Sequence, residues 1–589
     1  MRRLRIPLPV LPLLAVIVAG CLVPLGILFV YSFWRVDGFF LVHEWNLSNY
    51  AKSLFDGYYI GLLGRSLGTG AAVGAICVVI AYPFAYAARF RFVRARNALL
   101  FAVLISMFAS YLIRVYAFQS ILGQRGVINW ALMQLGVIDA PWSFLLFNRF
   151  AVLVTLTNVF LPFVILPVWA AMQNIEPSTI AAARDLGATP LGVFRRVVVP
   201  ATRTAALAGF SFAFVLASGD YVTPTLVGGT DGLMVGKVIA DQFGLTNNYP
   251  LGSALAFSML VLFALVLLVV PRLIGLMRRS AIAAGAPHVQ VPWPRWRWSV
   301  PGAGCWAHVW VAGTLAFLFL PLAIVVILSF TTREIPAFPL KGVTLHWYGN
   351  VFHDDAFSSA LRNSIVLALA TGAAAAVLGT LAALGLTRRR FVLRAPVQVA
   401  LLVPLALPGL ITGVAILTLL TWAHIPLSME TIALGHLVFA TPFVVLVMMA
   451  RLRDIDPSLG EAGRDLGRSS VGVFVHVTLP LIRPAMLGAA LVAAALSLDE
   501  FVITNFISGS NVTLPLFVWS KLRIGVTPDV NAVSTLILLA LALLVAISYL
   551  IGGSLHAGVA RTRRTTRPPT TRSVPTPNQG TYDMNAGSI

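Results

Sequence analysis

Long runs of apolar residues, separated by short polar connections, set the plan of the whole chain. Several runs approach or exceed the roughly 20 apolar residues that a helix needs to cross a bilayer. Examples are Leu8–Phe33, Leu251–Val270 and Ala532–Ile551. Lipid cannot satisfy unpaired backbone donors and acceptors, so spans of this kind are helices and not open sheets. The pattern predicts an all-α polytopic membrane protein.

Twelve transmembrane helices are predicted, six in each half of the chain. The expected spans are 8–34, 62–88, 98–118, 148–172, 203–226 and 251–277 in the first half, and 307–330, 364–387, 397–421, 430–451, 483–506 and 533–555 in the second. Between the halves, 278–306 is a basic segment rich in proline and tryptophan, which we interpret as a linker. The tail 558–589 is rich in threonine, proline and arginine, a composition typical of disorder. The predicted domains are therefore 1–277 and 307–557.

Composition and charge support this class and indicate an orientation. The chain is 58% hydrophobic and only 11% charged, with 42 basic against 21 acidic residues. The basic residues gather in short connections after alternate spans, for example Arg89 to Arg96 and Arg388 to Arg394. This is the positive-inside distribution of a membrane protein, and it does not form a basic face for nucleic acid. It predicts a multi-pass protein with both termini in the cytoplasm.

The two halves form an internal repeat. The tetrapeptide Arg-Asp-Leu-Gly occurs at 184–187 and again at 464–467, an offset of 280 residues. The same register holds without a gap over 174–200 and 454–480, and it still holds where Asp220 matches Glu500. Equal spacing in the same chain direction predicts two parallel, pseudo-symmetric modules.

The repeated segments 174–200 and 454–480 follow the fourth span of each half, on the predicted cytoplasmic side. Each contains small residues, a short helical stretch, a glycine, a phenylalanine, and a proline that opens the next span. This pattern resembles the EAA coupling loop of ABC importer permeases, although Ala181 stands where the family has glutamate in the first copy. The resemblance implies two fused six-helix domains of the ABC type I importer permease class, in a bacterial plasma membrane.

The resemblance also implies that each coupling loop, 174–200 and 454–480, contacts one of two copies of a cytoplasmic ATPase subunit. The residues expected to make this contact are Ala182, Ala183, Asp185, Gly187, Phe194 and Pro200 in the first loop, and Glu461, Ala462, Asp465, Gly467, Phe474 and Pro480 in the second. The chain itself has no phosphate-binding loop, because the nearest look-alike, Gly232–Val238, is one residue short and lacks the Ser/Thr after its lysine. ATP and magnesium are therefore expected on the partner. No cofactor, catalytic group or metal site is predicted in this chain.

A second resemblance concerns the cargo. The stretches SGDYVTPTLVGG (218–229) and SLDEFVITNFISGS (497–510) are similar to the fifth-span ends of the two permeases of spermidine/putrescine importers. Acidic residues inside a membrane protein are costly and usually line the bundle interior or a water-filled path. The predicted substrate pathway consists of Asp220, Tyr221, Asp499, Glu500 and Phe501. The alternative is a structural role, in which Arg114 neutralises Asp220.

The sequence therefore predicts the permease of an ATP-driven importer that receives a small solute from an extracytoplasmic binding protein. By resemblance, this solute is a polyamine. Opines, aminoethylphosphonate and ferric iron are the alternative cargos within related importers. An ion-coupled secondary transporter can also have two six-helix halves, but that class gives no reason for two matched cytoplasmic loops. Import as the direction of transport rests on the family resemblance.

Overall fold

The structure is a computed structural model that describes residues 6–38, 40–283, 305–388, 391–524, 527–540 and 543. The predicted linker 278–306 falls outside these residues apart from its two ends. The predicted tail 558–589 falls wholly outside them.

The first half consists of long apolar helices joined by short ones. The long helices are α1 and α2 (Leu11–Ile17 and Val23–Tyr31, continuous through the π-turn Val18–Leu22), α4 (Gly57–Phe90), α5 (Arg96–Phe108), α6 (Tyr111–Leu122), α8 (Arg149–Gln173), α11 (Val199–Ser218) and α13 (Tyr249–Ala283). The short helices are α3 (Ser48–Phe55), α7 (Val127–Gln134), α9 (Pro177–Asp185), α10 (Pro190–Val193) and α12 (Val235–Gly244). A small antiparallel hairpin, β1 (Arg35–Asp37) and β2 (Phe40–Val42), pairs Val36 with Leu41.

The second half repeats this order. Its long helices are α14 (Cys305–Leu328), α16 (Asp355–Arg388), α17 (Arg394–Ala406), α18 (Gly409–Trp422), α19 (Met429–Arg453) and α22 (Leu479–Asp499). Its short helices are α15 (His346–His353), α20 (Pro457–Asp465), α21 (Ser470–Val473), α23 (Thr504–Ile507) and α24 (Leu514–Ile524), and a further apolar helix covers Pro528–Ala540.

Eleven of the twelve predicted spans correspond to helices in the part of the chain that the structure describes. Nine are single helices long and apolar enough to cross a membrane, and two are pairs of helices with a sharp bend between them. The twelfth predicted span, 533–555, begins within the helix Pro528–Ala540, and most of it lies outside the described residues. The all-α polytopic class is confirmed.

The third span of each half, predicted at 98–118 and 397–421, is a pair of helices with a sharp bend. The first pair, α5 and α6, bends by 90° and the second pair, α17 and α18, bends by 104°. At the second bend Pro408 lacks a backbone N–H and forces the preceding residue into an extended conformation, which ends the helix. At the first bend Ala109 and Ser110 are extended without a proline. The start of α6 lies beside Asp499 of α22, and the start of α18 lies beside Gly219 at the end of α11.

The fifth spans are also shorter than predicted. Helix α11 ends at Ser218 and α22 ends at Asp499, whereas continuous spans to 226 and 506 were expected. After each break a separate short element follows, Pro224–Gly228 in the first half and α23 in the second. Asp220 and Glu500 therefore lie just beyond helix ends, where backbone N–H groups are free to bond a carboxylate.

Each half has a core of three helices in which small residues allow close contact. Helices α4, α8 and α11 pack together in the first half, and α16, α19 and α22 do so in the second. A Cβ atom at Gly70 of α4 would lie 2.0 Å from the Ser218 side chain, and one at Gly372 of α16 would lie 2.8 Å from the Ala490 carbonyl oxygen. Such small residues at contacts are how membrane helices approach closely without a hydrophobic driving force.

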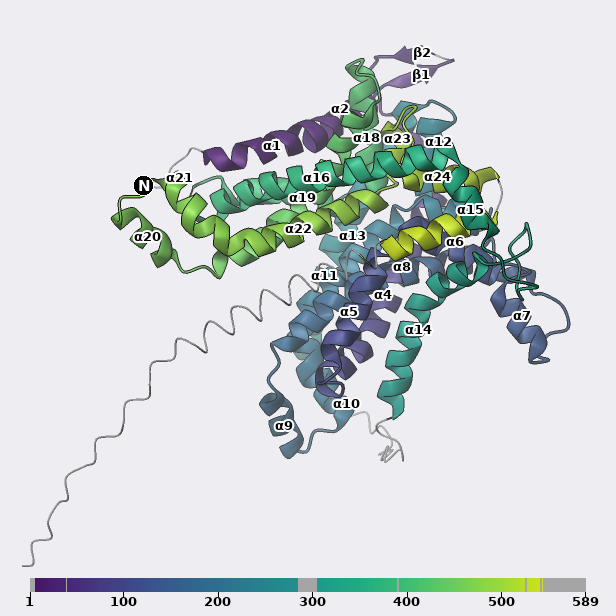
Figure 1. Cartoon of the computed structure of the whole chain (residues 1–589), viewed down its shortest axis with the longest axis horizontal. Helices are drawn as coiled ribbons and strands as arrows, with labels where there is room; N and C mark the ends of the chain where they lie inside the picture. Colours follow the sequence, from purple (N-terminus) through teal and green to yellow (C-terminus); the bar gives the residue numbers. More distant parts are fainter. Residues whose placement is uncertain are drawn as a thin grey trace, which may run out of the picture.

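The first span of each half packs against the opposite half. Helix α1 lies along α16 and α17, and α14 lies along α4, α5 and α6 (Figure 1). At these contacts Asn158 donates to the carbonyl oxygen of Phe317 at 2.6 Å, and Trp310 donates to that of Ile80 at 3.1 Å. The boundary between the halves in sequence is therefore not a boundary in packing.

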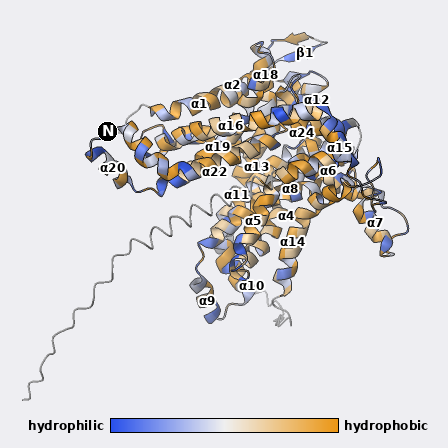
Figure 2. Cartoon of the chain, in the orientation of Figure 1, coloured by the Kyte–Doolittle hydropathy of each residue, from blue (hydrophilic) through white to orange (hydrophobic). Residues whose placement is uncertain are grey.

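The molecule has two arms that meet at one end and diverge at the other (Figure 1). The coupling loops, with α9 and α20, lie at the far ends of the two arms. Hydrophilic residues gather at both of these ends, while the long helices between are mostly hydrophobic (Figure 2). Where the arms meet, residues 109–114 and 219–223 of the first half approach 408–413 and 498–506 of the second. This region is called the junction below.

Candidate functional site

The two coupling loops have the same construction. In each, a nine-residue helix, α9 or α20, is followed by a four-residue helix and a π-turn that leads into the fifth span. The side chain of Thr189 accepts a hydrogen bond from Gly192 N at 3.1 Å, and Ser469 accepts one from Gly472 N at 3.1 Å. These N-caps satisfy the free donors at the start of α10 and α21. The sequence repeat is thus a repeat of structure.

The glycine of the repeated tetrapeptide ends the helix in each loop. Gly187 has φ +82° and Gly467 has φ +80°. Gly187 N bonds Arg184 O at 2.8 Å and Ala188 N bonds Ala183 O at 3.0 Å, the two hydrogen bonds of a Schellman motif. The second loop has the same pair of bonds, since Gly467 N bonds Arg464 O at 2.9 Å. The backbone conformation, and not lack of space, requires glycine here, because a Cβ at either position would have no neighbour within 4 Å.

The coupling loops present an exposed surface. Leu186 is 89% exposed and Leu466 is 85% exposed, directly before the two glycines. The predicted contact residues on this surface are also exposed, with Ala183 half-buried: Ala182, Asp185, Pro200, Glu461, Ala462, Asp465 and Pro480. Sequence reasoning had not singled out Leu186 and Leu466.

The two predicted phenylalanines point into their own halves. The ring of Phe194 packs against Tyr82 and Tyr86 of α4, with centroid separations of 5.6 and 6.3 Å. Phe474 packs beside the core of the second half. These contacts join the coupling loops to the arms.

Arginines at the ends of the second spans make a second connection to the coupling loops. Arg89 donates to the carbonyl oxygen of Ile175 at 3.5 Å, and Arg388 donates to that of Ile455 at 3.4 Å. Both carbonyl groups lie just before α9 or α20. In the second loop Asp456 caps α20 by accepting from Ser458 N at 2.9 Å, and these hydrogen bonds lower the pKa of the Asp456 carboxyl group. Each coupling loop is thus attached to its arm at both ends.

At the junction, Asp220 is buried and has its partners within the first half. The residue Asp220 is only 8% exposed. It accepts hydrogen bonds from the phenol of Tyr111, from Val222 N at 3.3 Å and from Thr223 N at 3.1 Å. The phenol also lies 3.3 Å from the Thr223 hydroxyl oxygen. Asp220 is therefore tied to α6 by one side chain, that of Tyr111.

Asp499 forms a hydrogen bond between the two halves. Both of its carboxylate oxygens lie 3.2 Å from Tyr111 N, the first amide of α6. A carboxylate at a helix N-terminus satisfies a free donor and interacts favourably with the helix dipole. The matching contact in the repeat is Gly219 against Pro408, where a Cβ on the glycine would lie 2.6 Å from the proline ring. The two arms are therefore joined by the start of each bent third span.

Glu500 is held by its own half. Its carboxylate accepts from Ile503 N at 2.8 Å, and its backbone carbonyl accepts from the Thr504 hydroxyl at 2.9 Å. The buried His436 of α19 lies 2.7 Å from the Ser497 hydroxyl oxygen and 2.8 Å from that of Thr504. His436 thus bridges the break between α22 and α23 that carries Glu500. Sequence reasoning missed His436, although a lone histidine within an apolar span indicates a buried polar contact.

The predicted aromatic residues Tyr221 and Phe501 face each other across the two halves. Their rings stack with centroids 6.3 Å apart, and Phe501 is only 1% exposed. Phe501 also contacts Trp519 of α24 at 5.0 Å. In this conformation the rings are covered and close the junction.

Arg114 does not pair with Asp220 as the structural alternative supposed. It is buried in α6, and its guanidinium donates to the carbonyl oxygen of Val159 at 3.2 Å. The carboxylate that acts on it electrostatically is Asp499. The junction therefore contains three carboxylates, those of Asp220, Asp499 and Glu500, and this guanidinium.

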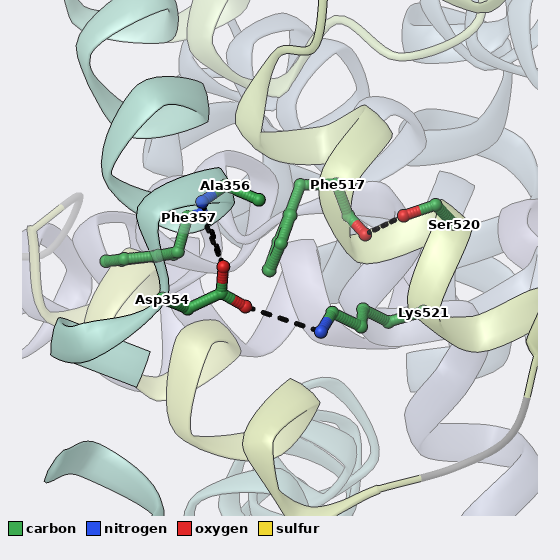
Figure 3. Close-up of polar contacts among 6 residues, drawn as sticks. All are labelled: Asp354, Ala356, Phe357, Phe517, Ser520 and Lys521. Carbon is green, nitrogen blue, oxygen red and sulfur yellow. Dashed lines mark hydrogen bonds and ion pairs between the residues drawn. The ribbon is translucent and has the colours of Figure 1, made fainter. Parts of the chain in front are cut away.

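A further ion pair lies at the end of the molecule remote from the coupling loops. Lys521 of α24 approaches Asp354 at 3.4 Å, and Asp354 accepts from the backbone N–H of Ala356 at 2.9 Å (Figure 3). Asp354 thus caps α16 and also contacts α24. Over the described residues, no group of three or more His, Cys, Asp and Glu side chains is arranged to hold a metal ion.

Comparison with protein families matches both halves of the chain. The family described as "Binding-protein-dependent transport system inner membrane component" matches residues 78–282 and 375–561, which together are about two thirds of the chain. Both matched ranges begin within the second span of a half and include a coupling loop.

Among curated proteins, the similar relatives are single polyamine permeases. The putrescine transport system permease protein PotI of Escherichia coli (strain K12) is 39% identical over 241 residues, which are 40% of this chain and 85% of the relative. The spermidine/putrescine permeases PotB and PotC of Haemophilus influenzae are 34% identical over 260 residues and 33% over 237. These alignments cover 44% and 40% of this chain, and 90% and 92% of the relatives. Each relative is thus about as long as one half of this chain.

Proposed function

The chain belongs to the family of binding-protein-dependent transport system inner membrane components, and we propose that it is the polyamine-translocating subunit of an ABC importer. It is a multi-pass inner-membrane permease with two permease domains fused in one chain. The proposal adds the cargo, the partners, the orientation and the residues of the pathway.

The cargo proposal rests on the three carboxylates at the junction. Asp220 of the first half lies close to Asp499 of the second through their shared contact with Tyr111, and Glu500 directly follows Asp499. Carboxylates grouped inside a membrane protein favour a cationic ligand. The relatives named above are putrescine and spermidine permeases, and such solutes carry several ammonium groups. Tyr221 and Phe501 would add ring faces for these groups once the junction opens.

We place the ATPase partners at the coupling loops. Two copies would dock, one on α9 with Leu186 and one on α20 with Leu466, since both loops have the same exposed construction. The connections from Phe194, Arg89 and Arg388 would then transmit movement of an ATPase to its arm. ATP and magnesium belong to those subunits in this proposal.

The orientation follows from the charges. The coupling loops and basic clusters would face the cytoplasm, together with both termini. The junction would then lie toward the outer side, where an extracytoplasmic binding protein delivers the substrate. Arms that join at the junction and diverge toward the coupling loops correspond to a conformation that faces the cytoplasm (Figure 1). Closure of the paired ATPases would bring the coupling loops together and open the junction outward.

Uptake of labelled putrescine and spermidine tests this function. Cells that lack the gene should lose uptake of both, and the intact gene should restore it. An Asp220→Asn, Glu500→Gln double variant should not restore it, because the cation loses its charged partners. The matched control is Asp231→Asn, since Asp231 forms an exposed ion pair with Arg149 at 3.3 Å, away from the junction.

Membrane amounts of every variant are compared by immunoblot, so that loss of assembly is not mistaken for loss of transport. Restoration of uptake by the double variant at full rate would contradict the acidic pathway. Polyamine uptake that does not depend on the gene, in cells without another polyamine system, would contradict the cargo. The remaining cargos of related importers would then be tested in the same cells.

A further inference from the structure

Tyr111 contacts carboxylates from both halves of the junction. Its phenol donates to Asp220 of the first half, and its backbone N–H lies 3.2 Å from both oxygens of Asp499 of the second half. Two donors on one residue thus occupy two acidic groups. The backbone N–H and the phenol of Tyr111 are separated by the length of a tyrosine. This length is similar to the distance between the two ammonium groups of a short diamine.

We propose that Tyr111 is a release latch: in the closed junction it takes the places of the substrate's ammonium groups on Asp220 and Asp499, so that the conformation facing the cytoplasm has little affinity for the cation. This inference rests on the proposed function and identifies how the pathway discharges its cargo. A transporter that moves a ligand needs different affinities in its two conformations, since equal affinity shifts nothing. Covering the carboxylates by an internal donor provides that difference.

The surroundings of Asp499 leave room for such an exchange. Asp499 and Ser110 are the polar members of an otherwise apolar lining around a cavity of about 380 Å³ between α6, α16 and α24. A methylene chain could lie against these walls while its ammonium group bonds Asp499. Asp220, by contrast, is buried and accepts a hydrogen bond from the Tyr111 phenol. When the arms rearrange and α6 separates from α22, Asp499 loses the backbone N–H of Tyr111. Asp220 becomes available when the ring of Tyr111, no longer held at the junction, turns its phenol away.

The same arrangement explains why the latch does not need a second tyrosine. The repeat places Gly409 at the start of α18, where Tyr111 starts α6, and Gly219 where the second half has Asp499. The contact there is between Gly219 and Pro408, which is apolar and holds no substrate group. The latch therefore occurs on one side of a pathway that both halves share.

The test is a Tyr111→Phe variant, which removes the phenolic donor and keeps the ring and the backbone N–H. The transporter is purified from its own membranes with the ATPase subunits that co-purify, and binding of labelled putrescine is measured without nucleotide. We expect wild type to bind putrescine weakly and Tyr111→Phe to bind it at least roughly tenfold more tightly. The free energy of a hydrogen bond to a charged group corresponds to a change in affinity of about this size. Adding Asp220→Asn to the variant should remove the gain.

Transport gives an independent measure. Slower release should lower the maximal uptake rate of Tyr111→Phe severalfold, while the half-saturating concentration, which the binding protein sets, stays the same. A merely structural defect would reduce the amount of assembled transporter and not increase putrescine binding. The matched control is Tyr50→Phe, because the phenol of Tyr50 on α3 lies 2.8 Å from the Ser32 hydroxyl oxygen, outside both the junction and the coupling loops.

The state of the junction is followed without any substrate by a disulfide between Gly219→Cys and Pro408→Cys, in a chain whose exposed Cys305 is replaced by serine. A protease site inserted between residues 290 and 291 lets a gel separate linked from unlinked halves. Tyr111→Phe should lower the cross-linked fraction, because the closed junction has lost one bond. Unchanged cross-linking together with unchanged putrescine binding would overturn the latch. If wild type takes up no putrescine, the cargo proposal is overturned instead, and the two failures are thus distinct.

Discussion

The glycines of the two coupling loops allow a prediction that depends on backbone conformation alone. Gly187 and Gly467 have φ of +82° and +80°, and no atom lies within 4 Å of where a Cβ would be. Substitution with alanine therefore causes no collision. It costs about 1–2 kcal/mol for a left-handed conformation, which is roughly a 5–30-fold change in the population of the capped helix end. The two sites lie on different arms, so the costs in the double variant should add.

This cost falls on elements that have little stability of their own. Helices α9 and α20 are short, exposed and peripheral, so they belong to the low-stability end of the structure. We expect the double alanine variant to assemble normally and to melt at the wild-type temperature. Its ATP-driven uptake should nevertheless fall severalfold, because the ATPase would dock on a frayed loop.

Asparagine provides the matched control for this prediction. It adopts the left-handed conformation more readily than other residues with a Cβ, although it is larger than alanine. Uptake should therefore decrease in the order Gly, Asn, Ala, Val at both positions, measured per unit of permease in the membrane. An order that follows side-chain size, with asparagine worse than alanine, would refute the argument from backbone conformation. Equal uptake with all four residues, the native glycine included, would refute the role of the loops in coupling.

Two other predictions concern assembly and stability. Gly70→Leu should abolish accumulation in the membrane, because its Cβ would lie 2.0 Å from the Ser218 side chain, whereas Gly64→Leu on the same helix has open space and should accumulate normally on an immunoblot. Lys521→Met should change the melting temperature by no more than about 2 °C, since a half-exposed ion pair contributes about 0–1 kcal/mol. Asp354→Ala should lower the melting temperature further, because it also removes the cap of α16 (Figure 3). Equal shifts for these last two variants would contradict the cap.

Hydropathy and the internal repeat were sufficient to predict much of the fold. Lipid imposes helices of a defined length, so apolar runs located eleven of the spans, although not the exact ends of the helices. The matched register also predicted that the coupling loops have the same structure, and they do, down to the Schellman bonds of Gly187 and Gly467. These features depend on residues close together in sequence.

Lateral packing could not be predicted in the same way. Nothing in the apolar run of α1 indicates that it packs on α16 instead of on its own half, because lipid-facing and protein-facing residues are equally apolar. The contact of Tyr111 with Asp499 joins residues 388 positions apart across the repeat. Proline at 408 was a sequence signal for one bend, whereas the bend at Ala109 and Ser110 has no such signal.

Differences between the halves are concentrated where function requires asymmetry. The coupling loops match because two ATPase copies would present two equal surfaces. At the junction, however, a hydrogen bond between Asp499 and Tyr111 N replaces the apolar contact of Gly219 with Pro408. In a homodimeric permease the two sides are identical, so the same contact would occur on both. Fusion or pairing of two different halves removes that constraint, so that one carboxylate pair and one covering tyrosine can serve a single pathway for an elongated cation.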